Sequence, residues 1–516
     1  MAAQLELSPK HLPVESDAVG WLSSAAARLR PVLAVSPDWL ALIFGAAAIL
    51  AGGAIAILID QLSGSATFLL LGIAAMVVVI CAFARPEWGL LALVFTLYAN
   101  FSDVLFKYHH APSIAKPFIG LMVAVIFVRR FLYGERPSGW MRPFLVLAAY
   151  GLVGAFSLLY APSPAYTQTA LSDYAKDMIV AMSVIMLLQR AKTLRRVIWV
   201  LLAAGILMAT LSIYQQFTGT FDEIYWGLAR SSASEIGADA ERRVSGPIGD
   251  PNFYAQILIV LVPLALDRLW SEPNRWLRLC AAWALSVASL TILFTYSRGG
   301  FLALIIALTL MWARRRPNLL TLLITVAAAV VLMQFAPDNY VERIKTIPES
   351  LMVFSGDTYT TDDSIRGRTS ENRAAWMMFM DHPLTGVGLN NYPVLYQNYS
   401  RLIGMDPRST MRAPHSFYLE IASQTGLLGL AAFGLVLWTV FGGLEQARKK
   451  FIAVGLPDYA SMATAFSVGL TGYLTTAIFL HSAYPRFWWL LVGIAFSIAI
   501  VAKRELAARR GKAMVN

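Results

Sequence analysis

The chain has 516 residues, of which 57% are hydrophobic and only 14% are charged. Soluble domains carry about 25% charged residues, so this composition excludes an ordinary soluble protein and indicates a chain built for lipid. The net charge of +11 does not indicate a nucleic-acid-binding protein. Most of its lysines and arginines stand in short runs at the ends of apolar segments, as topology signals do. The first strongly apolar run begins near Trp39, so we expect no cleaved signal peptide.

A membrane-spanning helix needs about 17–25 mostly apolar residues. The candidate segments, in chain order, are 40–58, 66–84, 88–104, 113–128, 143–160, 173–189, 197–214, 253–267, 277–296, 299–313, 318–335, 426–443, 460–480 and 486–502. Several of them are short, so we expect about 12–14 membrane helices. The predicted fold class is an all-α polytopic integral membrane protein.

Basic clusters follow alternate apolar segments and assign a side to each loop. They are Arg129-Arg130, Arg190 with Arg195-Arg196, Arg268 with Arg275 and Arg278, Arg314 to Arg316, Arg448 to Lys450, and Lys503-Arg504. The positive-inside rule places these loops, and therefore both termini, in the cytoplasm. The loops predicted on the other side are 161–172, 215–252, 297–299, 336–425 and 481–485.

The predicted organisation has five parts. They are a cytoplasmic tail (1–38), membrane helices with the external loop 215–252 (39–335), a large external loop (336–425), C-terminal membrane helices (426–502) and a second tail (503–516). Loops longer than about 12–15 residues are usually functional or disordered.

The loop 336–425 contains one predicted helix. We expect Thr369 or Ser370 as its N-cap and Asp381-His382-Pro383 as its end. Its predicted apolar stripe consists of Ala375, Trp376, Phe379 and Met380.

The informative arginines are those on the predicted outer side, several of which stand beside glycines. They are Arg242, Arg243, Arg298, Arg366, Arg368 and Arg412. A guanidinium binds phosphate oxygens in a bidentate manner, and glycine lets the backbone come close, so these segments suit a diphosphate. An isolated arginine at a helix end more often snorkels to the membrane interface. The presence of several such arginines on the same predicted side of the membrane favours diphosphate binding.

His415 follows Pro414 at the point where the long loop re-enters the membrane as a helix. A neutral histidine is a suitable general base near pH 7, although its position alone fits a structural role equally well. The sequence has no P-loop, no zinc motif, no nucleophile elbow and no Asp-x-Asp motif. We therefore expect neither a metal nor a cofactor.

Four segments in order resemble the superfamily of O-antigen ligases and Wzy-type polysaccharide polymerases. They are RRVSGPIGDPNFYA, YSRGG, RGRTSENR with HPLTGVGLNNY, and PHSFYLEIASQTGLLGL. The resemblance covers about residues 240–445. It implies a GT-C-like enzyme of the bacterial inner membrane. Such an enzyme would transfer a glycan from undecaprenyl diphosphate to an acceptor hydroxyl on the periplasmic face. The transfer would need no metal and would invert the anomeric configuration.

The resemblance also implies roles for individual residues. Arg243 or its neighbour Arg242, Arg298, and either Arg366 or Arg368 would hold the diphosphate, and His415 would activate the acceptor hydroxyl. Supporting positions would be Asn252, Gly386, Gly388 and Arg412. The implied partners are the lipid-linked glycan donor, a glycan or lipid-core acceptor, the lipid bilayer and envelope polysaccharide assembly proteins, with no nucleic acid.

Several alternatives remain open at the level of sequence. The acceptor would distinguish an O-antigen ligase, a polymerase and a protein O-glycosylating oligosaccharyltransferase. A small-anion or bicarbonate transporter would place ionisable residues near the bilayer midplane. Here the candidates Asp60, Asp173, Lys176, Asp177 and Asp267 lie near segment ends. A scaffold for an envelope assembly complex would not need arginines and a histidine that converge.

Overall fold

A computed structural model describes residues 82–132, 134–233, 242–315, 363–404 and 411–513. The predicted segments 40–58 and 318–335, and nearly all of 66–84, lie outside these residues. The chain forms two compact units. The smaller unit takes in residues 1–89 and 120–136, and the larger takes in residues 90–119 and 137–516. Helices α4 (Pro86–Tyr98) and α6 (Ala115–Leu132) each contribute to both units.

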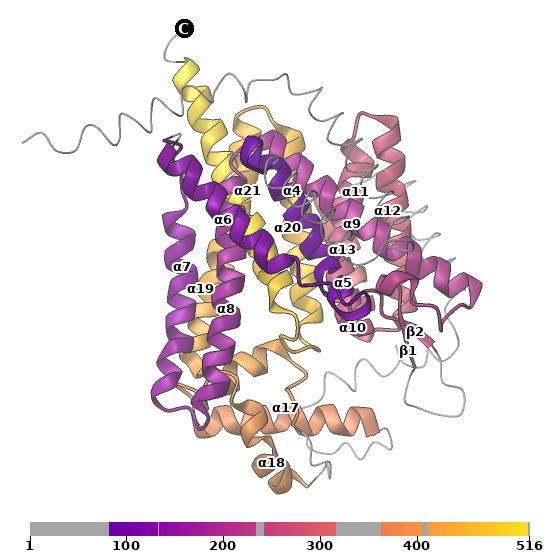
Figure 1. The fold of residues 1–516 in the computed structure, drawn as a ribbon, viewed down its shortest axis with the longest axis vertical. Helices are drawn as coiled ribbons and strands as arrows, with labels where there is room; N and C mark the ends of the chain where they lie inside the picture. The colour runs from indigo at the N-terminus through magenta and orange to yellow at the C-terminus, as the bar shows by residue number, and fades with distance from the viewer. Residues whose placement is uncertain (1–81, 133, 234–241, 316–362, 405–410, 514–516) are drawn as a thin grey trace, which may run out of the picture. The chain divides into compact units, whose positions relative to one another are not determined.

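The larger unit is helical throughout most of its described length (Figure 1). Its helices are α5 (Phe101–Tyr108), α7 (Met141–Phe156), α8 (Pro164–Leu187), α9 (Ala191–Thr218), α10 (Pro251–Ile259), α11 (Leu261–Ser271), α12 (Arg275–Phe294), α13 (Arg298–Arg315), α17 (Asp363–Asp381), α18 (Tyr392–Ile403), α19 (Phe417–Ala453), α20 (Pro457–Thr476) and α21 (Pro485–Ala513). The all-α class is therefore confirmed. One small addition was not predicted, an antiparallel pair of strands β1 (Ser231–Ala233) and β2 (Arg242–Val244).

Several helices are suited to cross a membrane. Within the described ranges, six are long and apolar enough, and the bent pair α4 and α5 would make a seventh. They are Met141–Leu159, Ala191–Thr218, Pro251–Ser271, Arg275–Phe294, Phe417–Ala453 and Pro485–Gly511. The protein is thus polytopic. The predicted segments 113–128, 173–189, 299–313 and 460–480 are also helical, as α6, α8, α13 and α20.

Large apolar side chains lie on the outer surfaces of these helices. Leu152 on α7 and Trp438 on α19 are 68% and 80% exposed. Side chains of this kind placed on the outside of a bundle are suited to lipid rather than to water.

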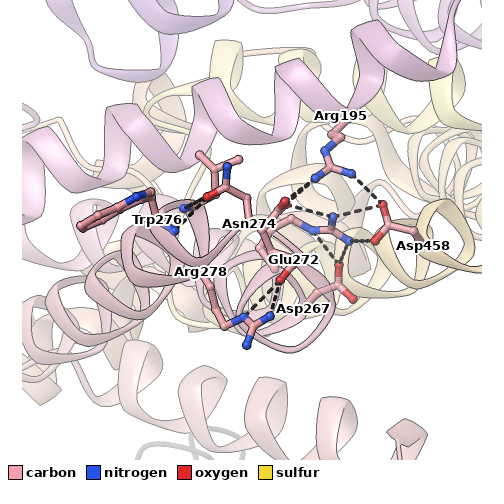
Figure 2. A network of polar contacts seen from close by, with 9 residues as sticks. Arg195, Asp267, Glu272, Asn274, Trp276, Arg278 and Asp458 are labelled. Carbon is pink, nitrogen blue, oxygen red and sulfur yellow. Dashed lines mark hydrogen bonds and ion pairs between the residues drawn. The ribbon is translucent and has the colours of Figure 1, made fainter.

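A cluster of ionic side chains joins α9, α11 and α20 at one end of the larger unit. Arg268 is fully buried and lies 2.6 Å from Asp267 and 2.8 Å from Asp458. Figure 2 shows Arg195 between Glu272 and Asp458, and its Nη2 lies 2.5 Å from Glu272. From the sequence we interpreted Arg195 and Arg268 as topology signals. The structure shows in addition that they pair with carboxylates, because the helix ends that carry them pack together.

Helix α20 separates this ionic cluster from the region of His415. Asp458 lies in its first turn, and Ala477 follows its last residue. Twenty helical residues span about 30 Å. The carbonyl of Ala477 accepts a hydrogen bond from the backbone N–H of Phe417 at 2.9 Å. The start of α19 therefore lies at the far end of α20 from the ionic cluster.

The predicted helix of the long loop is α17, and it contacts α18 and α19. In Figure 1, α17 runs across the ends of α7, α8 and α19 rather than along them. It ends at Asp381, as predicted, but it begins at Asp363 and not at a cap on Thr369 or Ser370. Those two residues are buried within the helix.

The buried face of α17 also differs from the predicted stripe. Its members Ala374, Ala375 and Met378 pack against Tyr392 and Tyr396 of α18. Of the predicted members, Trp376 and Met380 are exposed. Ala375 is buried as predicted, but the rest of the buried stripe is Ala374 and Met378, because this is the side of α17 on which Tyr392 and Tyr396 pack.

Candidate active site

His415 lies at the entrance to α19. The next residue, Ser416, is the N-cap of that helix, and its side chain accepts from the backbone N–H of Leu419. An N-cap residue adopts a non-helical backbone and fixes the direction in which the preceding residue leaves the helix. His415 is therefore held at the helix end rather than on a free loop.

Glu371 of α17 approaches His415 closely. Oε2 of Glu371 lies 2.5 Å from Nδ1 of His415, and the Glu371 side chain is only 2% exposed. The two atoms are close without being aligned as a hydrogen bond, and among the described residues neither has a hydrogen-bond partner elsewhere. The His415 side chain is 27% exposed although its Nδ1 is buried. The accessible part of the ring is therefore the part that carries Nε2.

A second histidine, His481, lies beside the first in the loop between α20 and α21. The ring centroids of His415 and His481 are 5.9 Å apart, and His481 also meets the ring of Phe253 at 5.2 Å. Burial, together with the neighbouring His415, lowers the pKa of His481 to about 4, while Asp250 acts in the opposite direction. His481 is therefore neutral near pH 7.

The loop 477–484 connects the segments that the sequence singled out. Phe479 packs on Gly299, where an added Cβ would come within 3.0 Å of its ring. The backbone N–H of Ser482 donates to Glu420 of α19 at 2.7 Å, and the Tyr484 hydroxyl donates to the carbonyl of Ile248 at 3.3 Å. The SRGG turn, the start of α19 and the segment before α10 thus all contact one short loop.

Arg242 and Arg243 point to opposite sides of β2, as neighbours on a strand do. Arg243 donates through Nε to the carbonyl of Thr295 at 2.8 Å and through Nη2 to Oδ1 of Asn252 at 3.1 Å. Arg242 is largely exposed, and its Nη2 lies 3.0 Å from Asp222. The structure therefore brings Arg243 and Asn252 together and directs Arg242 outward.

Arg298 begins α13 and is half-buried. The turn before it is held by the side chain of Ser297, which accepts from the backbone N–H of Gly300 at 3.2 Å. Thr295, whose carbonyl binds Arg243, is three residues earlier. The backbone that carries Arg298 is thereby tied to Arg243.

Arg366 and Arg368 are both half-buried on α17, the helix of Glu371. Side chains three residues apart on an α-helix lie within about 60° of each other, and side chains five apart are separated by about 140°. Arg368 therefore shares the side of α17 that carries Glu371, and Arg366 does not. Arg412, three residues before His415, approaches Glu371 with its Nε 3.8 Å from Oε1.

Comparison with protein families identifies the region that contains most of these residues. Residues 283–434 match the family model described as O-antigen ligase. This region belongs to the O-antigen ligase family. The match confirms the resemblance inferred from the sequence, and this family implies an enzyme of the glycan-transferring type. No curated protein matches the chain.

The ligase-family region includes Gly386 and Gly388, which the structure places in a backbone contact with α19. The backbone N–H groups of Val387 and Gly388 donate to the carbonyls of Ser423 and Gln424 at 2.8 and 2.9 Å. Gly386 has a φ of +66°, and a Cβ there would meet the backbone of Gln424 at 2.3 Å. Gly386 therefore serves close packing of this turn on α19, whereas a Cβ at Gly388 would meet Ala161 at 2.8 Å.

Two residues of this cluster were not selected from the sequence, Glu371 and His481. Glu371 is spaced with the buried Ala374, Ala375 and Met378 at helical intervals of three, four and seven residues. A carboxylate on a buried stripe is the signal that could have identified it. His481 had no comparable signal, because its significance arises from contact with residues far away in the chain.

Proposed function

We propose that the protein transfers a glycan from undecaprenyl diphosphate to a hydroxyl of an acceptor glycan or lipid core. The observation that supports this most is His415, a histidine with an accessible Nε2 and a buried carboxylate at its Nδ1. The same short loop connects it with the turn of Arg298 and the segment before α10. The ligase-family match supports the reaction type.

The proposed reaction is a direct displacement. Nε2 of His415 accepts the proton of the acceptor hydroxyl while that oxygen forms a bond to the anomeric carbon. The bond from the anomeric carbon to the diphosphate oxygen breaks, and its electron pair leaves with undecaprenyl diphosphate. Attack from the face opposite the leaving group inverts the anomeric configuration.

Arg243, Arg298 and Arg368 are the proposed ligands of the diphosphate. Negative charge develops on the leaving diphosphate, and preorganised guanidinium groups stabilise it. This arrangement assigns to arginines the task that a divalent cation performs in many other transferases. The proposal therefore expects full turnover in the presence of a metal chelator.

We assign this end of the protein to the periplasmic side of the bacterial inner membrane. The ionic cluster of Arg195 and Arg268 lies at the other end of α20. Clusters of arginine and lysine at helix ends are typical of the cytoplasmic side. The positive-inside rule and the length of α20 together support a site on the outer face.

The test is reconstitution of the purified protein in liposomes that contain a glycan linked to undecaprenyl diphosphate. The proposal predicts release of undecaprenyl diphosphate that depends on an added acceptor. Lipid core, a second lipid-linked glycan and a serine-containing polypeptide, each added separately, distinguish ligase, polymerase and protein glycosylation. Solute flux without release in any of the three would favour the transporter instead.

A further inference from the structure

We propose that Glu371 is a positioning residue for His415. In this role its carboxylate accepts a hydrogen bond from Nδ1–H of His415, so that Nε2 keeps its lone pair for the proton of the acceptor hydroxyl. This inference rests on the proposed function, because it assigns the base that Glu371 would serve. The contact at 2.5 Å carries it.

The burial of Glu371 is the first argument. Removing an ionised carboxylate from water is unfavourable unless a charged or hydrogen-bonding partner compensates. The Glu371 side chain is 2% exposed, and both His415 and Arg412 approach its carboxylate. His415 is the nearer of the two by more than 1 Å, at 2.5 Å against 3.8 Å.

Hydrogen bonds from neighbouring residues fix the backbone around both Glu371 and His415. The Tyr392 hydroxyl of α18 donates to the backbone carbonyl of Glu371 at 2.7 Å, and the Tyr396 hydroxyl donates to the adjacent Ser370 at 3.3 Å. On the other side, Ser416 fixes the backbone that follows His415. The carboxylate and the imidazole therefore meet at a fixed place where two separate elements join.

The consequence concerns the tautomer and charge of His415. A neutral imidazole has an N–H at one ring nitrogen and a lone pair at the other. The hydrogen bond made by one nitrogen determines which of the two carries the proton. A proton on Nδ1, directed at Glu371, leaves Nε2 free to accept the hydroxyl proton. The imidazolium that forms then lies beside a carboxylate, and its Nε2 proton passes to water after the product leaves. Neutral His481 packs on the ring without adding a second positive charge.

The test uses two substitutions of Glu371 in the full-length protein, in the liposome assay described above. Glu371→Gln keeps the shape but removes the charge. We expect kcat to fall about 10- to 100-fold, as it does for carboxylates that orient metal-bound histidines, with the KM for the donor within about twofold. Glu371→Asp keeps the charge and should retain more turnover than Glu371→Gln.

The matched control is Asp381→Asn, which neutralises an exposed carboxylate on the same helix. Asp381 accepts a hydrogen bond from Tyr399 at 2.7 Å, away from His415. It should leave kcat unchanged, and melting temperatures report whether each variant folds. Wild-type kcat in folded Glu371→Gln would overturn the inference. If that variant does not fold, Glu371→Asp decides. Its shorter side chain withdraws the carboxylate from Nδ1 of His415, so kcat should fall below the wild-type value, and wild-type kcat there would overturn the inference.

His415→Ala and Arg298→Ala distinguish failure of the positioning role of Glu371 from failure of the proposed function. If both lose turnover while Glu371→Gln retains it, the positioning role is wrong and the proposed function stands. If both retain turnover, the proposed site is wrong whatever Glu371 does.

Discussion

Arg242 and Arg243 are neighbours in the sequence, yet the structure gives them different surroundings. Arg243 contacts Thr295 and Asn252, whereas Arg242 pairs with the exposed Asp222. We predict that Arg243→Ala raises the KM for the lipid-linked donor and lowers turnover by about 10-fold or more, since a charge-assisted phosphate contact is lost. Arg242→Ala is the matched control. Equal effects of the two substitutions in the release assay would contradict the assignment.

The low pKa of His481 makes stability depend on pH. The pKa is about 4 in the folded protein and 6.5 for an unperturbed histidine. Between these values the unfolded chain binds a proton that the folded protein does not, so stability is complete above about pH 6.5 and decreases as the pH falls. The decrease from pH 7 to pH 5 is roughly 2 kcal/mol.

We predict that His481→Asn reduces this acid destabilisation, measured as the difference in melting temperature between pH 7 and pH 5. His382→Asn, at an exposed histidine on the turn after α17, is the control and should leave that difference unchanged. An unaltered pH dependence in His481→Asn would show that His481 is not held in its neutral form by burial.

The sequence indicated most of the charged residues of the candidate site but not which of them pair with one another. The arginines beside glycines and the histidine after Pro414 stood out by residue type and position. Strand alternation separates Arg242 from Arg243, but their short strand has no clear signal in the sequence. Glu371 and His481 depend on contacts between α17, α19 and the loop 477–484, which no local pattern specifies.

Helix α19 contains a break that joins it to the turn after α17. Gly426 has a φ of +64° and a ψ of −156°, and a Cβ there would lie 2.4 Å from the carbonyl carbon of Leu384. Next to it, the backbone N–H of Leu427 donates to the carbonyl of Pro383 at 2.8 Å. The break therefore lets α19 and the turn after α17 exchange backbone hydrogen bonds.

We predict that Gly426→Ala destabilises the protein by about 3 kcal/mol or more, because it combines backbone strain with a backbone clash. Gly434→Ala, on the same helix where a Cβ meets nothing within 4 Å, is the control. It should change stability by less than about 1 kcal/mol. Thermal unfolding in detergent measures both, and similar melting temperatures for the two variants would contradict the structure.

The ionic cluster at the ends of α9, α11 and α20 should stabilise the packing of these three helices. Arg268→Ala removes the cation that lies 2.6 Å from the buried Asp267, and removal of one member of a buried ion pair is destabilising by about 3–5 kcal/mol. Arg448→Ala removes an exposed pair with Glu445 and should cost less than about 1 kcal/mol. A wild-type melting temperature for Arg268→Ala would show that the cluster does not stabilise the packing of α9, α11 and α20.

Helix positions were easier to predict than their boundaries and faces. Apolar length indicated spans such as 277–296, which is α12 at Arg275–Phe294 with Asn274 as its N-cap. The start of α17 was misplaced because Thr369 and Ser370 are common cap residues, although here they lie inside the helix. The hairpin of β1 and β2 had no clear sequence signal because each strand has three residues.

For the whole molecule, hydropathy and charge predicted an all-α polytopic protein, and the structure confirms this class. The four motif segments lie far apart in the sequence, and the ends of α10, α13, α19 and α20 bring parts of them together. Their common contact with the loop 477–484 could not be read from the sequence, because that loop is short and carries no motif of its own.

We propose His415 as the base in transfer of a glycan from undecaprenyl diphosphate. The most direct measurement is single-turnover release of undecaprenyl diphosphate after acceptor is added to protein already loaded with the lipid-linked donor. We predict that His415→Ala binds the donor as the wild type does but releases the lipid at least about 100-fold more slowly. Release at the wild-type rate by folded, donor-loaded His415→Ala would contradict it.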